Sequence, residues 1–279
     1  MRRSLLQSVL LYACVVLVAL FTAGPLLWLV TMSISAPTDL TEVPLRWIPS
    51  EVDFSRYQTL LDLNDGSGER FLSALRNSIL TAGGATLLAL LLAVPAAYSF
   101  SRRNASMVLL FAFLATIMMP PITYILPLYS TFSSLGMLNK TLTLIVVYTA
   151  MLLPFATWLM KSNIDVLPIE VEQAAFMEGA STAYTIREVV LPLALPAIAA
   201  TAMLSFLVAW DEFFYALIFT NDLSAKTLPV AIADFSAGRV TDYGVIATVG
   251  VMATLPPAIL AICFQKFIVS GLVAGSVKG

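Results

Sequence analysis

The sequence predicts an all-α polytopic membrane protein with six transmembrane helices. Of its 279 residues, 59% are hydrophobic and only 11% are charged, and the mean hydropathy is +0.90. Several apolar stretches reach about 20 residues, the length that a helix needs to cross the hydrocarbon core of a bilayer. Polar connections separate these stretches, so the chain is expected to cross the membrane repeatedly.

We predict spans at residues 9–32, 77–100, 107–132, 141–160, 193–219 and 243–268. The first follows Arg2-Arg3, as in a secretory signal, but its apolar run continues to Met32. Because a signal core is only about 7–15 residues long, we interpret this stretch as an uncleaved span. In the polar stretch after it, 35–76, the segment 54–63 suits a short amphipathic helix on the membrane surface.

Positive charge indicates the orientation, because cytoplasmic loops carry an excess of Lys and Arg. Arg2-Arg3 and Arg102-Arg103 place the N-terminus and the second connection between spans inside. An even number of spans then places both termini in the cytoplasm. The connections outside are 35–76, 133–140 and 220–242, and the one inside is 161–192. The chain divides into a first helix with its extracytoplasmic loop, a transmembrane core and a cytoplasmic tail, at 1–72, 73–268 and 269–279.

Prolines predict a break in the third span. Pro120, Pro121 and Pro127 lie within its apolar run, and each removes a backbone donor, so the freed carbonyls need other partners. The stretch 120–127 therefore cannot be a straight helix. Broken helices at membrane depth usually line a cavity, so a solute pathway and a simple packing kink both remain open.

The fifth span carries two acids, in the sequence Trp210-Asp-Glu-Phe213. Asp211 follows Pro192 by nineteen residues, which corresponds to about 29 Å of helix and places both acids toward the outer leaflet. Ser205 and Glu212 share a helix face. Carboxylates beside aromatic rings suit a sugar, because they accept its O–H groups while rings stack on its C–H faces. The alternative is that both acids lie just outside the membrane.

Several site types are not indicated. The chain has no His, which excludes histidine proton relays, histidine triads and most metal sites. Cys14 and Cys263 lie in apolar stretches, where Cys behaves as a small hydrophobe. Lys226-Thr227 lacks the preceding glycines of a phosphate-binding loop, so ATP binding by that motif is not expected. A net charge of −2 does not suggest nucleic-acid binding.

The segment 170–192 is polar in an otherwise apolar region of the chain. It begins with acids, continues with Ala174-Ala175, and reaches Gly179 four residues later. The alanines allow close packing against a partner, and the glycine permits the positive-φ turn that ends a helix. This pattern predicts a compact helix-turn-helix on the membrane face that another protein can grip.

These motifs resemble the permease subunits of carbohydrate-uptake ABC importers, in particular the shorter membrane subunit of maltose-type transporters in the binding-protein-dependent type I permease family. The resemblance covers essentially the whole chain. Its matching segments are Pro168–Ala175, Glu178–Ala180, Leu191–Leu193, Pro196, Trp210–Phe213 and Phe267–Gly279. It implies the type I permease fold for the core, with 170–192 as the cytoplasmic coupling helix, or EAA loop.

The resemblance also implies a function. The chain would be a permease without enzymatic activity or a bound cofactor, in a bacterial inner membrane. It would translocate a sugar, expected to be a di- or oligosaccharide, that an extracytoplasmic solute-binding protein delivers. A second, non-identical permease would complete the pathway, and a separate ATPase dimer would use ATP and Mg.

Other functions remain as alternatives. Similar chains carry polyols or glycerol phosphates, but a phosphorylated solute would favour Arg or Lys in the pathway, and no predicted span has one in its interior. A secondary transporter would show paired inverted repeats and a buried ion-binding acid or His, and neither is visible. A membrane-embedded enzyme would need a nucleophile–base pair or a metal-ligand cluster, which the sequence does not indicate.

Three groups of site residues follow from the resemblance and the patterns above. The ATPase-coupling group is Glu172, Gln173, Ala174, Ala175, Glu178, Gly179 and Ala180. The substrate-pathway group is Ser205, Asp211, Glu212, Tyr124 and Tyr129. The group expected to contact the binding protein is Ser236, Gly238 and Arg239.

Two positions depart from the family pattern. Gln173 stands where the family usually has Glu, so Glu172 or Glu178 would have to supply the charge contact with the ATPase. Asp211 stands where the family often has Asn, which would make the sugar-facing chemistry more acidic.

Overall fold

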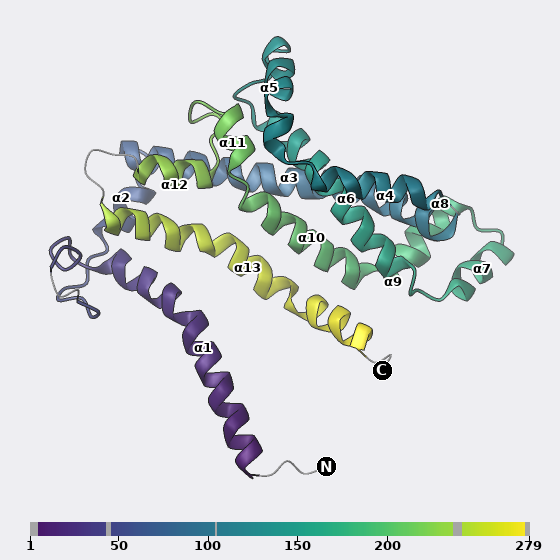
Figure 1. Ribbon diagram of the computed structural model, residues 1–279, viewed down its shortest axis with the longest axis horizontal. Coiled ribbons are helices and arrows are strands. Elements are labelled where there is room, and N and C mark those ends of the chain that lie inside the picture. Colours follow the sequence, from purple (N-terminus) through teal and green to yellow (C-terminus); the bar gives the residue numbers. More distant parts are fainter. Residues whose placement is uncertain (1–4, 43–45, 104, 237–241, 277–279) are drawn as a thin grey trace. The chain divides into compact units, whose positions relative to one another are not determined.

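The computed structural model describes residues 5–42, 46–103, 105–236 and 242–276, and these are mostly helical (Figure 1). An isolated β-bridge between Ser35 and Val52 is the extended pairing found in the described part. The α-helices are α1 (Leu5–Ile34), α2 (Ser55–Leu61), α3 (Gly66–Arg102), α4 (Met107–Ala115), α5 (Ile125–Ser134), α6 (Thr141–Ile164), α7 (Ile169–Met177), α8 (Thr182–Thr185), α9 (Leu191–Leu193), α10 (Leu195–Trp210), α11 (Phe214–Phe219), α12 (Leu228–Ser236) and α13 (Tyr243–Ser276). Short 3₁₀ turns at Thr116–Met118 and Pro121–Thr123 and a π turn at Ile186–Val190 complete the set.

Four described helices are long and apolar enough to cross a membrane: α1, α3, α6 and α13. They correspond to the first, second, fourth and sixth predicted spans. A fifth is obtained if the segment Thr182–Leu193 and helix α10, which are bent by 77° relative to each other, count as one span. The predicted all-α membrane fold is thus confirmed, whereas the count of six stays a prediction.

The third predicted span, 107–132, is interrupted rather than continuous. Helix α4 ends at Ala115, and Met119 and Pro120 have extended backbone angles, with ψ of 120° and 130°. A residue before proline is sterically driven out of the helical region, and here two prolines follow one another. The break expected from the sequence is confirmed, and α5 starts as a separate helix after it.

The fifth predicted span, 193–219, also differs from a single helix. It bends at Ala194, because Pro196 cannot donate the hydrogen bond that a continuous helix would direct to the carbonyl of Pro192. Helix α10 then ends at Trp210, nine residues before the predicted end, and α11 follows as a separate short helix.

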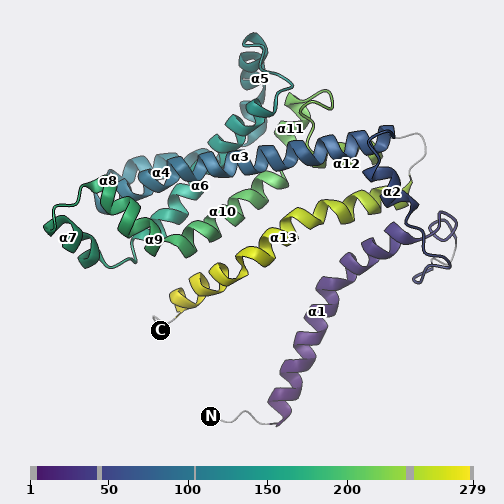
Figure 2. The ribbon, with the colours of Figure 1, turned by 180° about the vertical axis from the view of Figure 1, so that it is seen from behind.

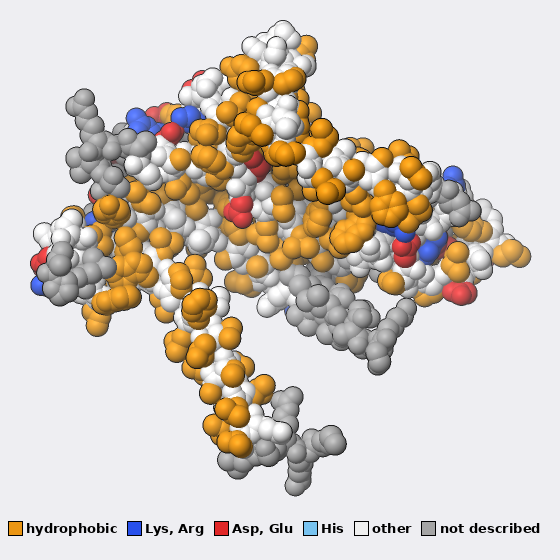
Figure 3. Space-filling model, in the orientation of Figure 1, with side chains coloured by type: hydrophobic (Ala, Val, Ile, Leu, Met, Phe, Trp, Pro, Cys, Tyr) orange, Lys and Arg blue, Asp and Glu red, His pale blue; other side chains and the backbone are white. Residues whose placement is uncertain are grey.

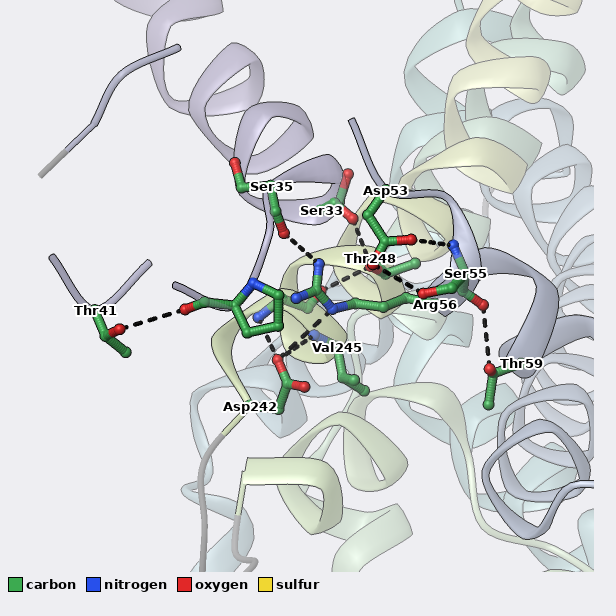
Figure 4. A network of polar contacts seen from close by, with 12 residues as sticks. Ser33, Ser35, Thr41, Asp53, Ser55, Arg56, Thr59, Asp242, Val245 and Thr248 are labelled. Carbon is green, nitrogen blue, oxygen red and sulfur yellow. Dashed lines mark hydrogen bonds and ion pairs between the residues drawn. The ribbon is translucent and has the colours of Figure 1, made fainter. Parts of the chain in front are cut away.

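The first of two compact units comprises residues 1–72 and 231–255. Its buried Arg56, on α2, donates from Nη1 to the carbonyl of Ser35 at 2.7 Å, and its Nε lies 3.8 Å from Oδ1 of Asp242. Thr248 of α13 donates to the carbonyl of Ser33 at 3.2 Å. Figure 4 shows how these side chains converge, so that polar contacts tie α1, α2 and α13 together within this unit.

The second unit comprises residues 73–230 and 256–279. Helix α6 packs against α4, α10 and α11, and α3 lies along it (Figure 2). The close approach of α3 depends on small residues. An ideal Cβ at Gly84 would lie 3.0 Å from the Ile145 side chain, and a stripe of alanines on α3 is fully buried, at positions Ala82, Ala85, Ala89, Ala93 and Ala97.

Candidate functional sites

Helix α7 and the turn after it form the first candidate site, the coupling segment, defined as residues 169–181. Glu178 ends the helix, and Gly179 has a φ of +87°. The N–H of Gly179 donates to the carbonyl of Phe176, and the N–H of Ala180 donates to that of Ala175, both at 3.0 Å. These two bonds define a Schellman turn, so the positive-φ turn predicted at this glycine is confirmed.

The coupling residues predicted from the sequence lie mostly on the surface. Gln173, Ala174, Glu178 and Gly179 are exposed, whereas Ala175 and Ala180 are half-buried. Figure 3 shows acidic and basic side chains around α7 and α8, with apolar side chains beside them. The segment therefore exposes a helix and turn of mixed character, with the apolar side chains of Val171, Phe176 and Met177 beside its acids, which a protein partner can contact.

Glu172 is the exception in this group, since it is only 3% exposed. Its Oε2 accepts from the Tyr98 hydroxyl at 3.0 Å, and its Oε1 accepts from Nε of Arg102 at 2.8 Å. Of the two acids expected to supply a charge contact, Glu172 is thus engaged within the chain, and Glu178 is the exposed one.

A neighbouring acid stabilises the connection from α6 to α7. Oδ1 of Asp165 accepts from the Ser101 hydroxyl, and its Oδ2 accepts from the Lys161 ammonium, both at 2.6 Å. Although burial acts to raise it, these hydrogen bonds from Lys161 and Ser101 hold the pKa of Asp165 below its ordinary value. The carboxylate therefore stays charged at neutral pH and fixes the start of this connection.

The second candidate site is an aromatic pocket of about 650 Å³. Its wall includes Pro121 and Tyr124 from the broken third segment, so residues of the proline break line a cavity. The other lining residues come from the 3₁₀ turn after α4 and from α5, α6, α10 and α11, and include Thr116, Leu128, Phe132, Phe155, Val208 and Tyr215.

Tyr215 is the centre of the polar contacts at this pocket. Its hydroxyl forms a short hydrogen bond with the hydroxyl of Tyr124. Its backbone N–H donates to Oε1 of Glu212 at 2.9 Å, and the other carboxylate oxygen accepts from the N–H of Ala216 at 3.3 Å. Glu212 thus satisfies free donors at the start of α11, a position where a negative charge is favourable.

Three of the five predicted pathway residues lie around Tyr215, and of these Tyr124 is the one that lines the pocket in the described part of the chain. Tyr124 and Glu212 contact Tyr215 directly, and the ring of Tyr129 stacks 6.3 Å from Phe219, which in turn stacks 6.3 Å from Tyr215. Tyr215 itself was not predicted, although its position three residues after Glu212 places it within one helical turn. That spacing was the available signal.

The other two predicted pathway residues lie apart from this cluster. Ser205 is fully buried, and its Oγ has no hydrogen-bond partner among the described residues. Asp211 is exposed at the C-terminal end of α10. Of the residues expected to contact a binding protein, Ser236 ends α12 and is exposed, while Gly238 and Arg239 lie outside the described residues.

Comparison with known proteins identifies the relatives of this chain. Residues 85–273 match the family described as binding-protein-dependent transport system inner membrane component. The trehalose/maltose transport system permease protein MalG of Thermococcus litoralis is 34% identical, with all of both chains covered. The trehalose transport system permease protein SugB of Mycobacterium tuberculosis is 33% identical over 91% of this chain and 92% of its own length.

Two further relatives extend the comparison. The sulfoquinovosyl glycerol transport system permease protein SmoH of Agrobacterium fabrum is 32% identical over 91% of this chain and 88% of its own length. A chain in the crystal structure of a bacterial ABC transporter involved in the import of the acidic polysaccharide alginate superposes with a TM-score of 0.78. It is 22% identical, with 95% of this chain and 99% of that one covered, and it shows that the two share a fold. The chain therefore belongs to the family of inner membrane components of binding-protein-dependent transport systems, as a permease subunit of an ABC transporter and not as its ATPase.

Proposed function

We propose that this permease translocates a neutral di- or oligosaccharide in an ATP-driven importer. The aromatic pocket is the observation that carries the proposal. Its lining includes four aromatic residues, two of which, Tyr124 and Tyr215, have paired hydroxyls. Rings and hydroxyls suit the C–H faces and the O–H groups of a sugar. The names of relatives such as the trehalose/maltose and trehalose permeases support the same substrate class.

The charge of the pocket favours a neutral solute. Among the described residues, its lining includes no Lys or Arg, so a phosphate or carboxylate entering it would lose water without gaining a cationic partner there. A neutral sugar requires only hydrogen bonds and stacking contacts. The pathway group of this proposal is Tyr124, Tyr129, Asp211, Glu212 and Ser205, now joined by Tyr215.

The remaining parts of the importer follow from the family. A solute-binding protein would deliver the sugar, a second and non-identical permease would complete the pathway, and an ATPase dimer would hydrolyse ATP with Mg. Both termini of this chain and the coupling segment would lie in the cytoplasm. There the exposed Glu178 would supply the charge contact with the ATPase, while Gln173 contributes a neutral amide. Ser236, Gly238 and Arg239 would face the binding protein outside.

The substrate class is tested with the solute-binding protein of the importer. Calorimetric titration with trehalose, maltose, raffinose, glycerol 3-phosphate and a polyol should show tight binding of a neutral di- or oligosaccharide alone. The complete transporter, reconstituted in proteoliposomes, should then accumulate that sugar only when ATP is present on the side of the membrane where the ATPase lies. Binding of the phosphate or the polyol would contradict the sugar assignment, and uptake driven by an ion gradient without ATP would contradict the importer mechanism.

The coupling segment is tested at Gly179. No described atom outside the neighbouring residues lies within 4 Å of an ideal Cβ at this position, so Gly179→Val mainly alters the backbone preference, at a cost of about 1–3 kcal/mol for a β-branched residue with positive φ. We expect the variant to insert in the membrane but to lose most sugar-stimulated ATPase activity and transport. Gly179→Asn is the matched control, because Asn tolerates this conformation, and it should retain most activity. Full coupling in the Val variant would show that α7 is not the dock.

A further inference from the structure

We propose that Arg102 is a positioning residue that carries movement of α7 into the membrane helices α3 and α6, through its buried ion pair with Glu172. The inference rests on the proposed coupling role of α7 and adds the route by which that helix acts on the core. Three sets of contacts support it, all within the second compact unit.

The first set joins α7 to α3. The side chains of Arg102 and Glu172 are only 11% and 4% exposed, and their Nε and Oε1 atoms are 2.8 Å apart. The Tyr98 hydroxyl, one helical turn before Arg102, donates to the second carboxylate oxygen. Both oxygens of Glu172 are therefore held by one face of α3. A buried carboxylate is costly unless it is paired and hydrogen-bonded in this way.

The second set joins the same guanidinium to α6. Nη2 of Arg102 donates to the carbonyls of Ile164 and Leu167, each at 2.9 Å. Ile164 is the last residue of α6, and the terminal carbonyls of a helix lack partners within it and carry partial negative charge. Arg102 thus satisfies the end of α6 while it binds Glu172. One side chain therefore fixes the relative positions of three helices.

The third set explains why this link matters for movement. Helix α7 packs against α8 and the π turn that follows it, and the Glu172 side chain adds a direct link from α7 to α3. The pair adjoins an apolar cluster that excludes water and strengthens the electrostatic attraction. This cluster consists of Val94, Ala97 and Tyr98 of α3, Met160 and Ile164 of α6, and Val190 and Ala194. A displacement of the exposed face of α7 is therefore transmitted to the ends of α3 and α6 through the ion pair.

A variant that lacks both charges distinguishes an ion pair that only stabilises the fold from one that also transmits movement of α7. Arg102→Met alone would leave a buried unpaired carboxylate and is expected to fold poorly. The double variant R102M/E172M removes both charges, and such replacements often keep or raise stability. We expect it to assemble with its partners, to unfold at a somewhat lower temperature than the parent because the carbonyls of Ile164 and Leu167 lose this donor, and to transport at least about tenfold less sugar per ATP hydrolysed. A double variant that assembles and is as well coupled as the parent would overturn the inference.

A milder pair of variants keeps the proposal testable if the double variant fails to assemble. Glu172→Gln preserves shape but removes the charge, and Glu69→Gln is the matched control, because Glu69 is exposed in the first turn of α3, at the opposite end of that helix from Arg102. Transport per ATP should fall in the first and stay near the parent value in the second. Equal values in both would contradict the role of Arg102.

The Gly179→Val experiment separates this inference from the proposed function. If Gly179→Val uncouples transport from ATP hydrolysis but R102M/E172M and Glu172→Gln do not, α7 is the dock and only the route through Arg102 is wrong. If none of these variants uncouples the transporter, the docking role of α7 itself is wrong.

Discussion

The side chain of Asn139 hydrogen-bonds to three residues of a distant connection, Asn221, Asp222 and Ser224. Asn139 is the non-glycine residue with positive φ in the described part of the chain, at +59°. Its Oδ1 accepts from the N–H groups of Asn221 and Asp222, at 3.0 and 3.2 Å, and its Nδ2 donates to the Ser224 hydroxyl at 3.1 Å. Its own N–H donates to the carbonyl of Phe219 at 2.8 Å. The residue therefore joins the connection before α6 to the connection after α11.

Asn139 leads to a prediction about stability. Asn139→Gly removes the side-chain hydrogen bonds but tolerates the backbone angle, and it should cost about 1–2 kcal/mol. Asn139→Ala loses the same bonds and adds about 1 kcal/mol for the left-handed conformation, so it should be the less stable of the two. Chemical unfolding in detergent micelles measures both differences. If the two variants unfold like the parent, these bonds do not stabilise the fold.

At the scale of elements, the sequence predicted some boundaries because single residues determine them. Gly179 and the Pro120-Pro121 pair act through their own backbone chemistry. The positive-φ turn and the break in the third span could therefore be predicted directly from the sequence. The end of α10 at Trp210 could not, because the apolar run continues to Phe219 and hydropathy does not show that Glu212 starts a new helix. The burial of Glu172 was equally hidden, because its partner Arg102 is 70 residues away in the sequence.

The packing of α13 against α2 gives a prediction at this scale, within the first unit. An ideal Cβ on Gly244 would lie 2.2 Å from the guanidinium carbon of Arg56. Gly244→Ala should therefore displace that guanidinium from the Ser35 carbonyl and destabilise the protein by about 1.5–3 kcal/mol, the contribution of a hydrogen bond to a charged group. In an Arg56→Met background the same substitution should cost much less, because the displaced group is absent.

A control on the same helix strengthens this experiment. A Cβ at Gly250 would make only an ordinary contact, 3.4 Å from the Leu29 side chain. Gly250→Ala should therefore be neutral or slightly stabilising, since Ala favours a helix by about 0.5–1 kcal/mol over Gly. Additive costs for Gly244→Ala and Arg56→Met, measured as a double-mutant cycle, would mean that the two residues do not interact energetically.

At the scale of the whole molecule, the distribution of apolar surface indicates which surroundings, lipid or protein, the chain requires. The most apolar window of α1 is not buried at all inside the chain, and that of α13 is only 17% buried, compared with 50% for α6. Figure 3 shows apolar side chains covering much of the visible surface of each unit. Large exposed apolar areas mark lipid or protein contacts. The composition alone predicted this environment, whereas the site required the structure, because Tyr215 is recognised only by what it contacts.

Transport by the assembled importer provides the last prediction, which concerns the aromatic pocket. Tyr215→Phe removes the hydroxyl that pairs with Tyr124 and keeps the ring, so it should raise the apparent KM for sugar about tenfold, the equivalent of about 1.4 kcal/mol. Tyr12→Phe is the matched control, because Tyr12 is exposed on α1, outside the pathway group, and it should change KM less than about threefold.

The adjacent acids refine the same measurement. Glu212→Ala should weaken transport as Tyr215→Phe does, because the start of α11, which positions Tyr215, loses its acceptor. Asp211→Ala should weaken it only if the exposed carboxylate meets the sugar directly. Co-purification of the partner subunits in normal ratio is required of every variant. If Tyr215→Phe and both alanine variants transport like the parent across a range of sugar concentrations, the sugar is held by the partner permease and this pocket does not bind it.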